Sequence, residues 1–149
     1  MAVPFKAPVK DITFGYEVID SYNILNKISE FSDFSEDIVI PTMEECAKFS
    51  EEVLAPINAI GDQQGATIDN GVVKMPQEFV DAYKKFAEAG WASISLPEEI
   101  GGGGQPITLS GGTLEILSTA NLAFGLAPGL SAGAISAINF HGSQEQKDT

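Results

Sequence analysis

An apolar stripe with steps of three and four residues is the strongest signal in the sequence, and it predicts a long helix over about residues 41–60. Its members are Val39, Met43, Cys46, Phe49, Val53, Ile57 and Ile60. This spacing gathers apolar side chains on one helical face and leaves glutamates on the other. Pro41 suits the first turn, Pro56 predicts a kink or an early end, and Gly61-Asp62 is expected to stop the helix.

The same periodicity predicts three later helices, over about residues 76–89, 108–120 and 128–140. Gly90 is expected to cap the first of them, because glycine readily adopts the left-handed conformation found at helix ends. Ser143 is placed to cap a further helical start. The residues expected to face inward are Phe79, Val80, Tyr83, Phe86, Ala87, Leu109, Leu114 and Leu117.

Two segments depart from this helical pattern. Asn70-Gly71 stands between short β-prone runs in residues 67–73 and predicts a two-stranded hairpin turn. Residues 1–36 are mixed, with prolines at the start, a moderate helical rhythm over 20–34 and an acidic loop at 32–37. The fold class is therefore expected to be all-α with a short β-hairpin, divided into an N-terminal extension (1–36) and a helical domain (37–149).

Composition narrows the possible functions. The 149 residues are 44 % hydrophobic, which suits one globular domain with a core. With 21 acidic and 8 basic residues, the formal net charge is −13. This charge excludes a general positively charged surface for binding nucleic acid or anionic membranes. Cys46 is the single cysteine and is expected in the core. With no apolar signal-peptide segment and no apolar run of the ~20 residues that a membrane span needs, a cytoplasmic location is expected.

Several candidate sites have simpler interpretations. The run Gly101–Gly104 lacks a following Lys-Ser/Thr, and Pro106 interrupts the helix entry, so we expect a backbone passing close to another element rather than a phosphate loop. His141 is the only histidine, which argues against a metal site, and it is expected to cap helix carbonyls. Neighbouring glutamates diverge by about 100° on a helix, so the acidic pairs are expected to be solvated surface.

Gly125, Gly129 and Gly133 recur every four residues, which places them along one side of the last long helix. Each glycine inside a helix costs roughly 1 kcal/mol relative to alanine, so something is expected to lie close to this backbone. A packed neighbouring helix and a slender apolar ligand both satisfy the pattern. Spacing alone favours the neighbouring helix.

Four segments resemble the N-terminal helical domain of acyl-CoA dehydrogenases, in the order and spacing of that family. They are FSEEVLAP (residues 49–56), GW with LPEEIGG (90–91 and 96–102), EILSTAN (115–121) and HGSQEQK (141–147). The resemblance covers about residues 37–149. KAPVKD (6–11), Phe14, GDQQGA (61–66) and APGL (127–130) resemble one branch, which includes enzymes acting on 3-methylthiopropionyl-CoA and related short or medium acyl-CoA dehydrogenases.

The resemblance implies an enzyme with a helical N-terminal domain, a middle β-domain and a C-terminal helical bundle. In this family a glutamate of the C-terminal bundle removes the Cα proton of the thioester, FAD accepts hydride from Cβ, and an electron-transfer flavoprotein or similar acceptor is reduced. The flavin-contacting β-domain and the catalytic glutamate would lie beyond Thr149. The chain is therefore expected to be C-terminally incomplete, to hold no catalytic residue and to be inactive alone.

What the resemblance does imply for these residues is one wall of the acyl cavity. Counting back from His141-Gly142, the matching substrate-binding positions are Gly125, Leu126, Gly129, Leu130 and Gly133. This favours the ligand interpretation of the glycine line over a packed helix. The resemblance also implies a homo-oligomer for the whole enzyme. A stand-alone helical interaction protein derived from this domain is the alternative.

Overall fold

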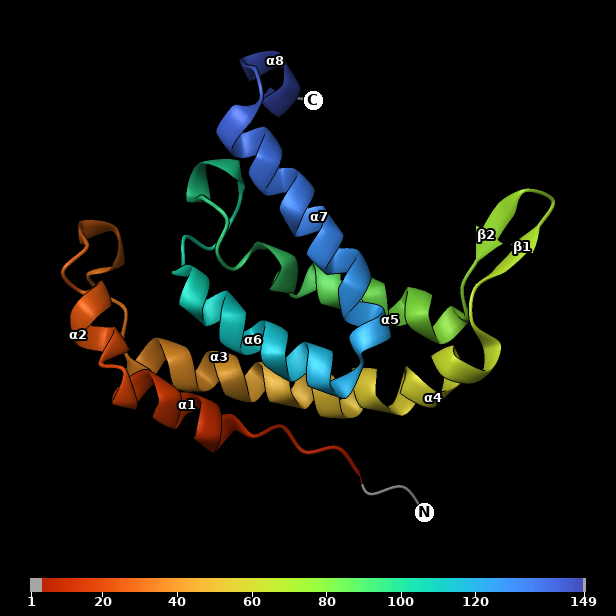
Figure 1. The fold of residues 1–149 in the computed structure, drawn as a ribbon, viewed down its shortest axis with the longest axis horizontal. Helices are drawn as coiled ribbons and strands as arrows, with labels where there is room; N and C mark the ends of the chain where they lie inside the picture. The colour runs from red at the N-terminus through yellow and green to blue at the C-terminus, as the bar shows by residue number, and fades with distance from the viewer. Residues whose placement is uncertain (1–3, 149) are drawn as a thin grey trace.

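A continuous helical rod is the longest feature of the structure, a computed structural model that describes residues 4–148. α3 (Glu36–Phe49) runs into a π-helical turn, η2 (Ser50–Leu54), and then into α4 (Ala55–Gln64) (Figure 1). The helix predicted over residues 41–60 lies inside this rod, which is longer than predicted at both ends.

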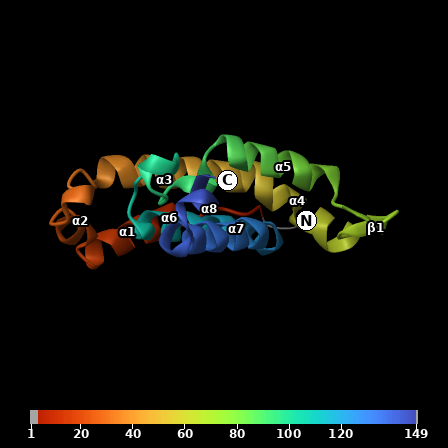
Figure 2. The same ribbon diagram turned by 90° about the horizontal axis from the view of Figure 1, so that it is seen from above.

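The helices of the chain lie in two layers. Seen from above, α3 and α5 lie on one side and α1, α6 and α7 on the other (Figure 2). The all-α class with one hairpin is confirmed. The flanking elements are α1 (Val9–Val18), α2 (Ser21–Leu25), the 3-10 turn η1 (Ser29–Phe31), β1 (Thr67–Asp69), β2 (Val72–Lys74), α5 (Gln77–Glu88), the 3-10 turns η3 (Trp91–Ser93) and η4 (Glu98–Ile100), α6 (Ile107–Ala120), α7 (Leu122–His141) and α8 (Gln144–Asp148).

One core runs through all of these layers. Tyr16 of α1 and Phe34 are buried in the same cluster as Met43 of α3 and Ile116 of α6. Tyr16 also donates a hydrogen bond to the Thr108 carbonyl, 2.6 Å away. Packing is thus continuous across residue 36, and the division into an extension and a domain remains a prediction about sequence organisation.

The first residues of two helices, α1 and α3, differ from the sequence analysis. α1 was not predicted, because Pro8 was taken as a break; instead the Pro8 carbonyl accepts from the amides of Asp11 and Ile12 and begins the helix. α3 begins at Glu36, so the last two residues of the loop predicted over residues 32–37 belong to the helix. Pro41 consequently lies inside the helix rather than in its first turn. Burial of Val39, which has no exposed surface, requires helix before Pro41 and outweighs the amide that proline lacks.

Of the kink or early end predicted at Pro56, the early end is wrong, and the π-helical turn supplies the reason. A proline inside an α-helix clashes with the carbonyl four residues earlier and removes one hydrogen bond. Here the amide of Ala55 bonds to the Ser50 carbonyl five residues earlier, so the wider turn admits one extra residue directly before Pro56. The helix then continues to Gln64.

Gly61 does not stop the helix as predicted, because it makes room for an aromatic ring. A Cβ built on Gly61 would lie 2.5 Å from Cζ of Phe79 in α5, a contact that no side chain tolerates. The chain turns four residues later at Gly65, whose φ of 61° lies in the region that favours glycine. The glycine therefore sets how closely α5 approaches α4.

Asn121 joins the rod to α7. Its side chain is buried; Nδ2 donates to the Leu54 carbonyl at 3.1 Å, and Oδ1 accepts from the Phe124 amide at 3.0 Å. The second bond is a helix N-cap, so α7 begins at Leu122 rather than at Pro128 as predicted. The capping signal was present in the sequence, but it stood ahead of the glycines and proline that weakened the helical pattern.

The hairpin and α5 follow their predictions. Asn70 and Gly71 both have positive φ, and β1 pairs antiparallel with β2. Gly90 adopts the left-handed conformation after α5. Four residues expected to face inward are instead exposed, because they lie outside the sides of α5 and α6 that pack on neighbours within residues 4–148: Val80, Tyr83, Ala87 and Leu114.

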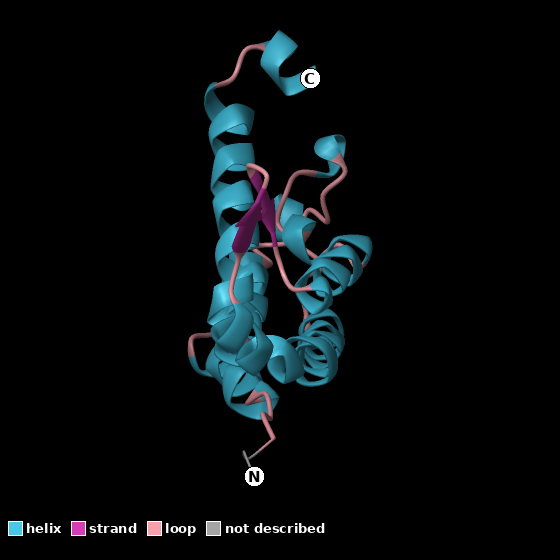
Figure 3. Cartoon of the chain, turned by 90° about the vertical axis from the view of Figure 1, so that its right-hand side faces the viewer, coloured by secondary structure: helices cyan, strands magenta, loops and turns pink. Residues whose placement is uncertain are grey.

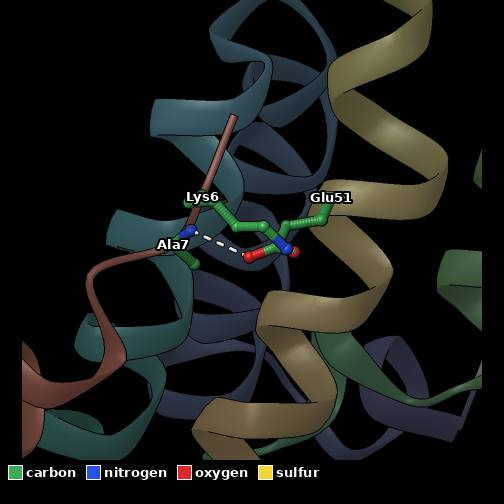
Figure 4. A network of polar contacts seen from close by, with 3 residues as sticks. All are labelled: Lys6, Ala7 and Glu51. Carbon is green, nitrogen blue, oxygen red and sulfur yellow. Dashed lines mark hydrogen bonds and ion pairs between the residues drawn. The ribbon is translucent and has the colours of Figure 1, made fainter. Parts of the chain in front are cut away.

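The N-terminal arm is tied to the rod through Glu51. The Lys6 ammonium forms an ion pair with Glu51 Oε2, and the Ala7 amide donates to Oε1 at 3.0 Å (Figure 4). The hydrogen bonds from Lys6 and then from Ala7 lower the pKa of Glu51. Lys6 is exposed, so the contribution to stability is small.

We expect Asn121→Ala to lower the free energy of unfolding by about 1.5–2.5 kcal/mol. Loss of the N-cap costs about 1 kcal/mol, and loss of the hydrogen bond to the Leu54 carbonyl costs about 0.5–1.5 kcal/mol. Chemical denaturation measures the effect, with Asn58→Ala, an exposed change within α4, as the control expected to shift stability by less than about 0.5 kcal/mol. Equal effects of the two changes would contradict the linking role of Asn121.

We expect Glu51→Gln to cost about 0.2–1 kcal/mol of unfolding free energy at neutral pH. The folded pKa of Glu51 lies below its unfolded value, so its stabilising effect is present above the unfolded pKa and is lost as pH falls through the folded pKa. The stability gap to the unmodified protein should therefore close in acid. Denaturation at several pH values tests this, with Glu52→Gln as the neighbouring control; a gap that persists at low pH contradicts it.

Candidate functional site

α7 leaves most of its apolar surface uncovered. The helix rises away from the α3–α4 rod and carries α8 near its tip (Figure 3). Phe124 is its buried residue, whereas Leu122, Leu126, Leu130 and Phe140 are exposed. Contrary to the sequence analysis, α7 is long and apolar enough, by length and composition alone, to cross a membrane. One such helix does not by itself establish a membrane span.

The predicted substrate-binding residues form one stretch of this helix. A Cβ built on Gly129 or Gly133 would meet no atom within 4 Å, and Gly125 faces only Ser118 Oγ at 3.4 Å. Leu126 and Leu130 project between them with 61 % and 77 % of their surface exposed. Within residues 4–148, no neighbouring helix packs on Gly129 or Gly133. The structure brings the five residues together; their role stays a prediction.

A separate apolar groove of about 430 Å³ lies between α5 and α7. Its lining residues are Met75, Phe79, Val80, Tyr83, Lys84, Ala123, Phe124 and Ala127. Phe79, Phe86 and Phe124 pack edge to face or tilted beneath it, which makes the floor rigid. The sequence analysis missed this groove because it assigned Val80 and Tyr83 to the core. Both residues lie at the margin of the apolar stripe of their helix, and this position was the signal that could have indicated a surface groove.

Ala123 and Ala127 reach this groove from a different side of α7 than the glycine line. Residues two apart on an α-helix point about 200° apart, so Ala123 and Gly125 diverge, as do Ala127 and Gly129. The glycine line therefore faces away from the groove, whereas Leu126 and Leu130, three residues after Ala123 and Ala127, lie near the groove side of α7.

The glycine-rich loop has the structure expected of a close backbone contact. A Cβ on Gly102 would lie 2.1 Å from the Leu96 carbonyl oxygen, and one on Gly103 would lie 2.8 Å from that of Ile94. The amides of Gly104 and Gln105 bond to these two carbonyls at 3.0 Å. The interpretation of the run as a close backbone approach is confirmed.

His141 does not cap carbonyls as predicted. The end of α7 is closed by the Gly142 amide, which bonds to the Ile138 carbonyl at 2.8 Å, while the imidazole lies beside the Phe140 ring. The predicted Ser143 cap is present: Ser143 Oγ accepts from the Gln146 amide, and Gln146 Oε1 accepts from the Ser143 amide. No group of His, Cys, Asp and Glu among the described residues is arranged to hold a metal ion.

Cys46 lies in the core, as predicted. Its side chain is fully buried, and Sγ lies 3.5 Å from the Thr113 carbonyl oxygen, to which it donates. Burial raises the pKa of the Cys46 thiol to about 12. A thiol with that pKa is a packing residue, since only the thiolate is an effective nucleophile.

The two surfaces of α7 offer few polar groups for a dinucleotide. A dinucleotide needs donors gathered around its pyrophosphate, usually backbone amides at a helix N-terminus or clustered basic side chains. The groove between α5 and α7 holds one charged residue, Lys84, and the bare face of α7 holds none.

Comparison with known proteins gives two findings. The family model described as the acyl-CoA dehydrogenase N-terminal domain matches residues 41–149. The chain is similar to a 3-methylmercaptopropionyl-CoA dehydrogenase of Ruegeria pomeroyi, with 37 % identity over 143 residues. The match covers 96 % of this chain and 24 % of that protein, so the chain spans about a quarter of the length of its curated relative.

We expect Cys46 to resist thiol-specific labelling in the folded protein at pH 8. At that pH a pKa of about 12 leaves roughly one thiolate in ten thousand, and the side chain is closed to reagent. Labelling followed by mass spectrometry checks this, with a denatured sample as the positive control. Modification at the same rate before and after denaturation would show that the thiol is accessible.

Proposed function

The chain belongs to the acyl-CoA dehydrogenase family through its N-terminal helical domain, and from this we propose that it forms the N-terminal part of an FAD-dependent acyl-CoA dehydrogenase. The whole enzyme would convert an acyl-CoA thioester into its 2-enoyl-CoA. FAD, held mainly by other parts of that enzyme, would accept the electrons. 3-Methylthiopropionyl-CoA or a short or medium acyl-CoA is the proposed substrate.

In this proposal, the residues of α7 form one wall of the acyl cavity. Gly125, Leu126, Gly129, Leu130 and Gly133 are the proposed substrate-binding positions. Their surroundings support the assignment, because this stretch is uncharged and a Cβ built on Gly129 or Gly133 would meet no atom within 4 Å. An acyl chain needs an apolar wall with room beside it, and both properties are present.

The single observation that carries the proposal is the open space at Gly129. Glycine costs roughly 1 kcal/mol relative to alanine within a helix, and none of the described residues makes use of the space that its missing side chain leaves. A close-packed neighbour inside this chain would have explained the glycine. Without one, an external occupant of this face is the better explanation.

The remaining parts of the proposal concern partners. The whole enzyme would pass electrons to an electron-transfer flavoprotein or similar acceptor, would assemble as a homo-oligomer and would act in the cytoplasm. A catalytic glutamate would come from outside this chain, so we assign no catalytic residue here.

A stand-alone helical interaction protein is the second candidate, and the exposed apolar surface of α7 favours it. The coding DNA after the codon for Thr149 discriminates between the two. Continuation into a β-domain supports the enzyme, whereas a stop codon with separate expression of the short product supports the interaction protein.

We expect Gly129→Leu, made in the whole enzyme, to lower kcat/KM by about 5- to 150-fold, with the longest acyl chains affected most. A leucine side chain in the cavity would overpack it, at a cost of about 1–3 kcal/mol. Each 1.4 kcal/mol corresponds to a tenfold change in an equilibrium constant, which gives the expected range. Leucine is also the better helix former, so Tm should change little.

The matched control is Gly111→Leu, which replaces an exposed glycine of α6 that also has open space around its Cα. It should leave the chain-length profile unchanged. If Gly129→Leu lowers Tm strongly and reduces kcat/KM equally for every acyl length, Gly129 is a packing glycine and the cavity assignment fails.

A further inference from the structure

A cavity of about 560 Å³ lies between α1 and α6 and shares no lining residue with the groove between α5 and α7. Ile12 and Ile19 of α1 give it apolar walls. Gly15 lies between them and leaves the cavity open, because a Cβ built on it would meet no atom within 4 Å. Glycine weakens the interior of a helix, yet none of the described residues fills the space beside this one. The space is therefore available to a ligand.

Two carboxylates lie at the same level of this cavity, one on each helix. α1 and α6 run in opposite directions (Figure 1), and Tyr16 Oη bonds to the Thr108 carbonyl and lies 2.9 Å from a Cβ built on Gly112. Tyr16 is thus level with the turn between Thr108 and Gly112. Asp11 lies five residues before Tyr16, and Glu115 lies five residues after the middle of that turn. Because both helices rise equally per residue, Asp11 and Glu115 face each other across the cavity.

The charge of this cavity is negative and is not neutralised by neighbours. Its lining includes Asp11 and Glu115 but no basic residue, and within residues 4–148 neither carboxylate forms an ion pair. Burial, and then the coulombic effects of Tyr22 and Glu115, raise the pKa of Tyr16 to about 12, so its phenol stays protonated and donates to the Thr108 carbonyl. Two facing carboxylates repel each other, and a cation between them relieves this repulsion.

Ser21 gives a second, independent indication of a ligand. It lines the same cavity, only 4 % of its surface is exposed, and its hydroxyl forms no hydrogen bond within residues 4–148. The unpartnered side-chain atoms that the described protein encloses completely are Ser50 Oγ and Trp91 Nε1, so the Ser21 hydroxyl is open to the cavity. A hydroxyl in a buried residue is stabilised by a polar partner, and a ligand in the cavity can supply one.

We propose that this cavity binds a small aliphatic diamine, with one ammonium group between Asp11 and Glu115 and the hydrocarbon part against Ile12 and Ile19. An ammonium group carries only donors, which matches the two carboxylates, and the hydroxyl of Ser21 is a further acceptor. Charge complementarity and an apolar body together give such a site its selectivity.

Other ligand classes fit these residues less well. An acyl-CoA is anionic and would be repelled by the two carboxylates, so this site is separate from the proposed substrate wall on α7. A divalent metal ion is disfavoured, because no group of three possible ligands is arranged to hold one among the described residues. The proposal does not rest on the dehydrogenase function.

The test is isothermal titration calorimetry of 1,4-diaminobutane into the full-length protein at physiological ionic strength, which screens general attraction to the net charge of −13. Asp11→Asn and Glu115→Gln, two isosteric changes of exposed residues, should each weaken binding by about tenfold. Glu17→Gln is the matched control, because it removes the same charge from α1 outside the cavity, and it should leave the affinity unchanged.

The position of the ligand is tested by Gly15→Leu, which places a side chain in the open space and should abolish the binding heat. 1,4-Butanediol, a molecule of the same length without charge, should not bind. Circular dichroism verifies that each variant is folded.

Four results would overturn the proposal. The diamine could give no binding heat; Glu17→Gln could weaken binding as much as Glu115→Gln, which would indicate general attraction to an acidic protein; Gly15→Leu could leave the affinity unchanged, which would place the ligand elsewhere; or Mg²⁺ could compete at equal concentration, which would indicate a simple cation site. Each of these results leaves the proposed dehydrogenase function intact.

Discussion

The side-chain amide of Asn121 is the contact on which the arrangement of this chain depends. It donates to a carbonyl of the π-helical turn and accepts from the first turn of α7, so one buried residue ties the α3–α4 rod to the helix that carries the proposed site. A buried amide is stable only when its donor and its acceptor are both used, which restricts α7 to one position against the rod. The π-helical turn has two functions, since it admits Pro56 and presents the Leu54 carbonyl to Asn121.

This contact also determines which side of α7 is bare. A helix turns by about 100° per residue, so beginning α7 one residue later would rotate the glycine line away from its present side and move Ala123 and Ala127 out of the groove. The cap at Asn121 sets the first residue, and Phe124, packed on Phe79 and Phe86, sets the rotation. Interactions in the first turn therefore determine which residues of α7 face the groove and which face away from it.

The sequence predicted those elements in which one local signal dominates. The hairpin follows from Asn70-Gly71, the end of α5 from Gly90, and the core position of Cys46 from its place in a regular stripe. The errors occur where two signals compete. Pro41, Pro56 and Gly61 are breakers by local propensity, yet burial of Val39, the π-helical turn and the ring of Phe79 override each of them through contacts distant in sequence. The groove was not predictable, because exposure of Val80 and Tyr83 depends on where α7 lies.

The sequence of α7 gives the helix a low intrinsic helical propensity. Three glycines at roughly 1 kcal/mol each and an interior proline at about 3 kcal/mol make this helix intrinsically poor. Within residues 4–148 the opposing contributions come chiefly from the N-cap and the burial of Phe124, both before Pro128. From Pro128 onward, the helix half-buries Ala132 and Ile135 and exposes Leu130 and Phe140. Gly129 and Gly133 therefore lie in the part of α7 where the residues described here bury no side chain fully, and this is the part that carries most of the proposed substrate-binding residues.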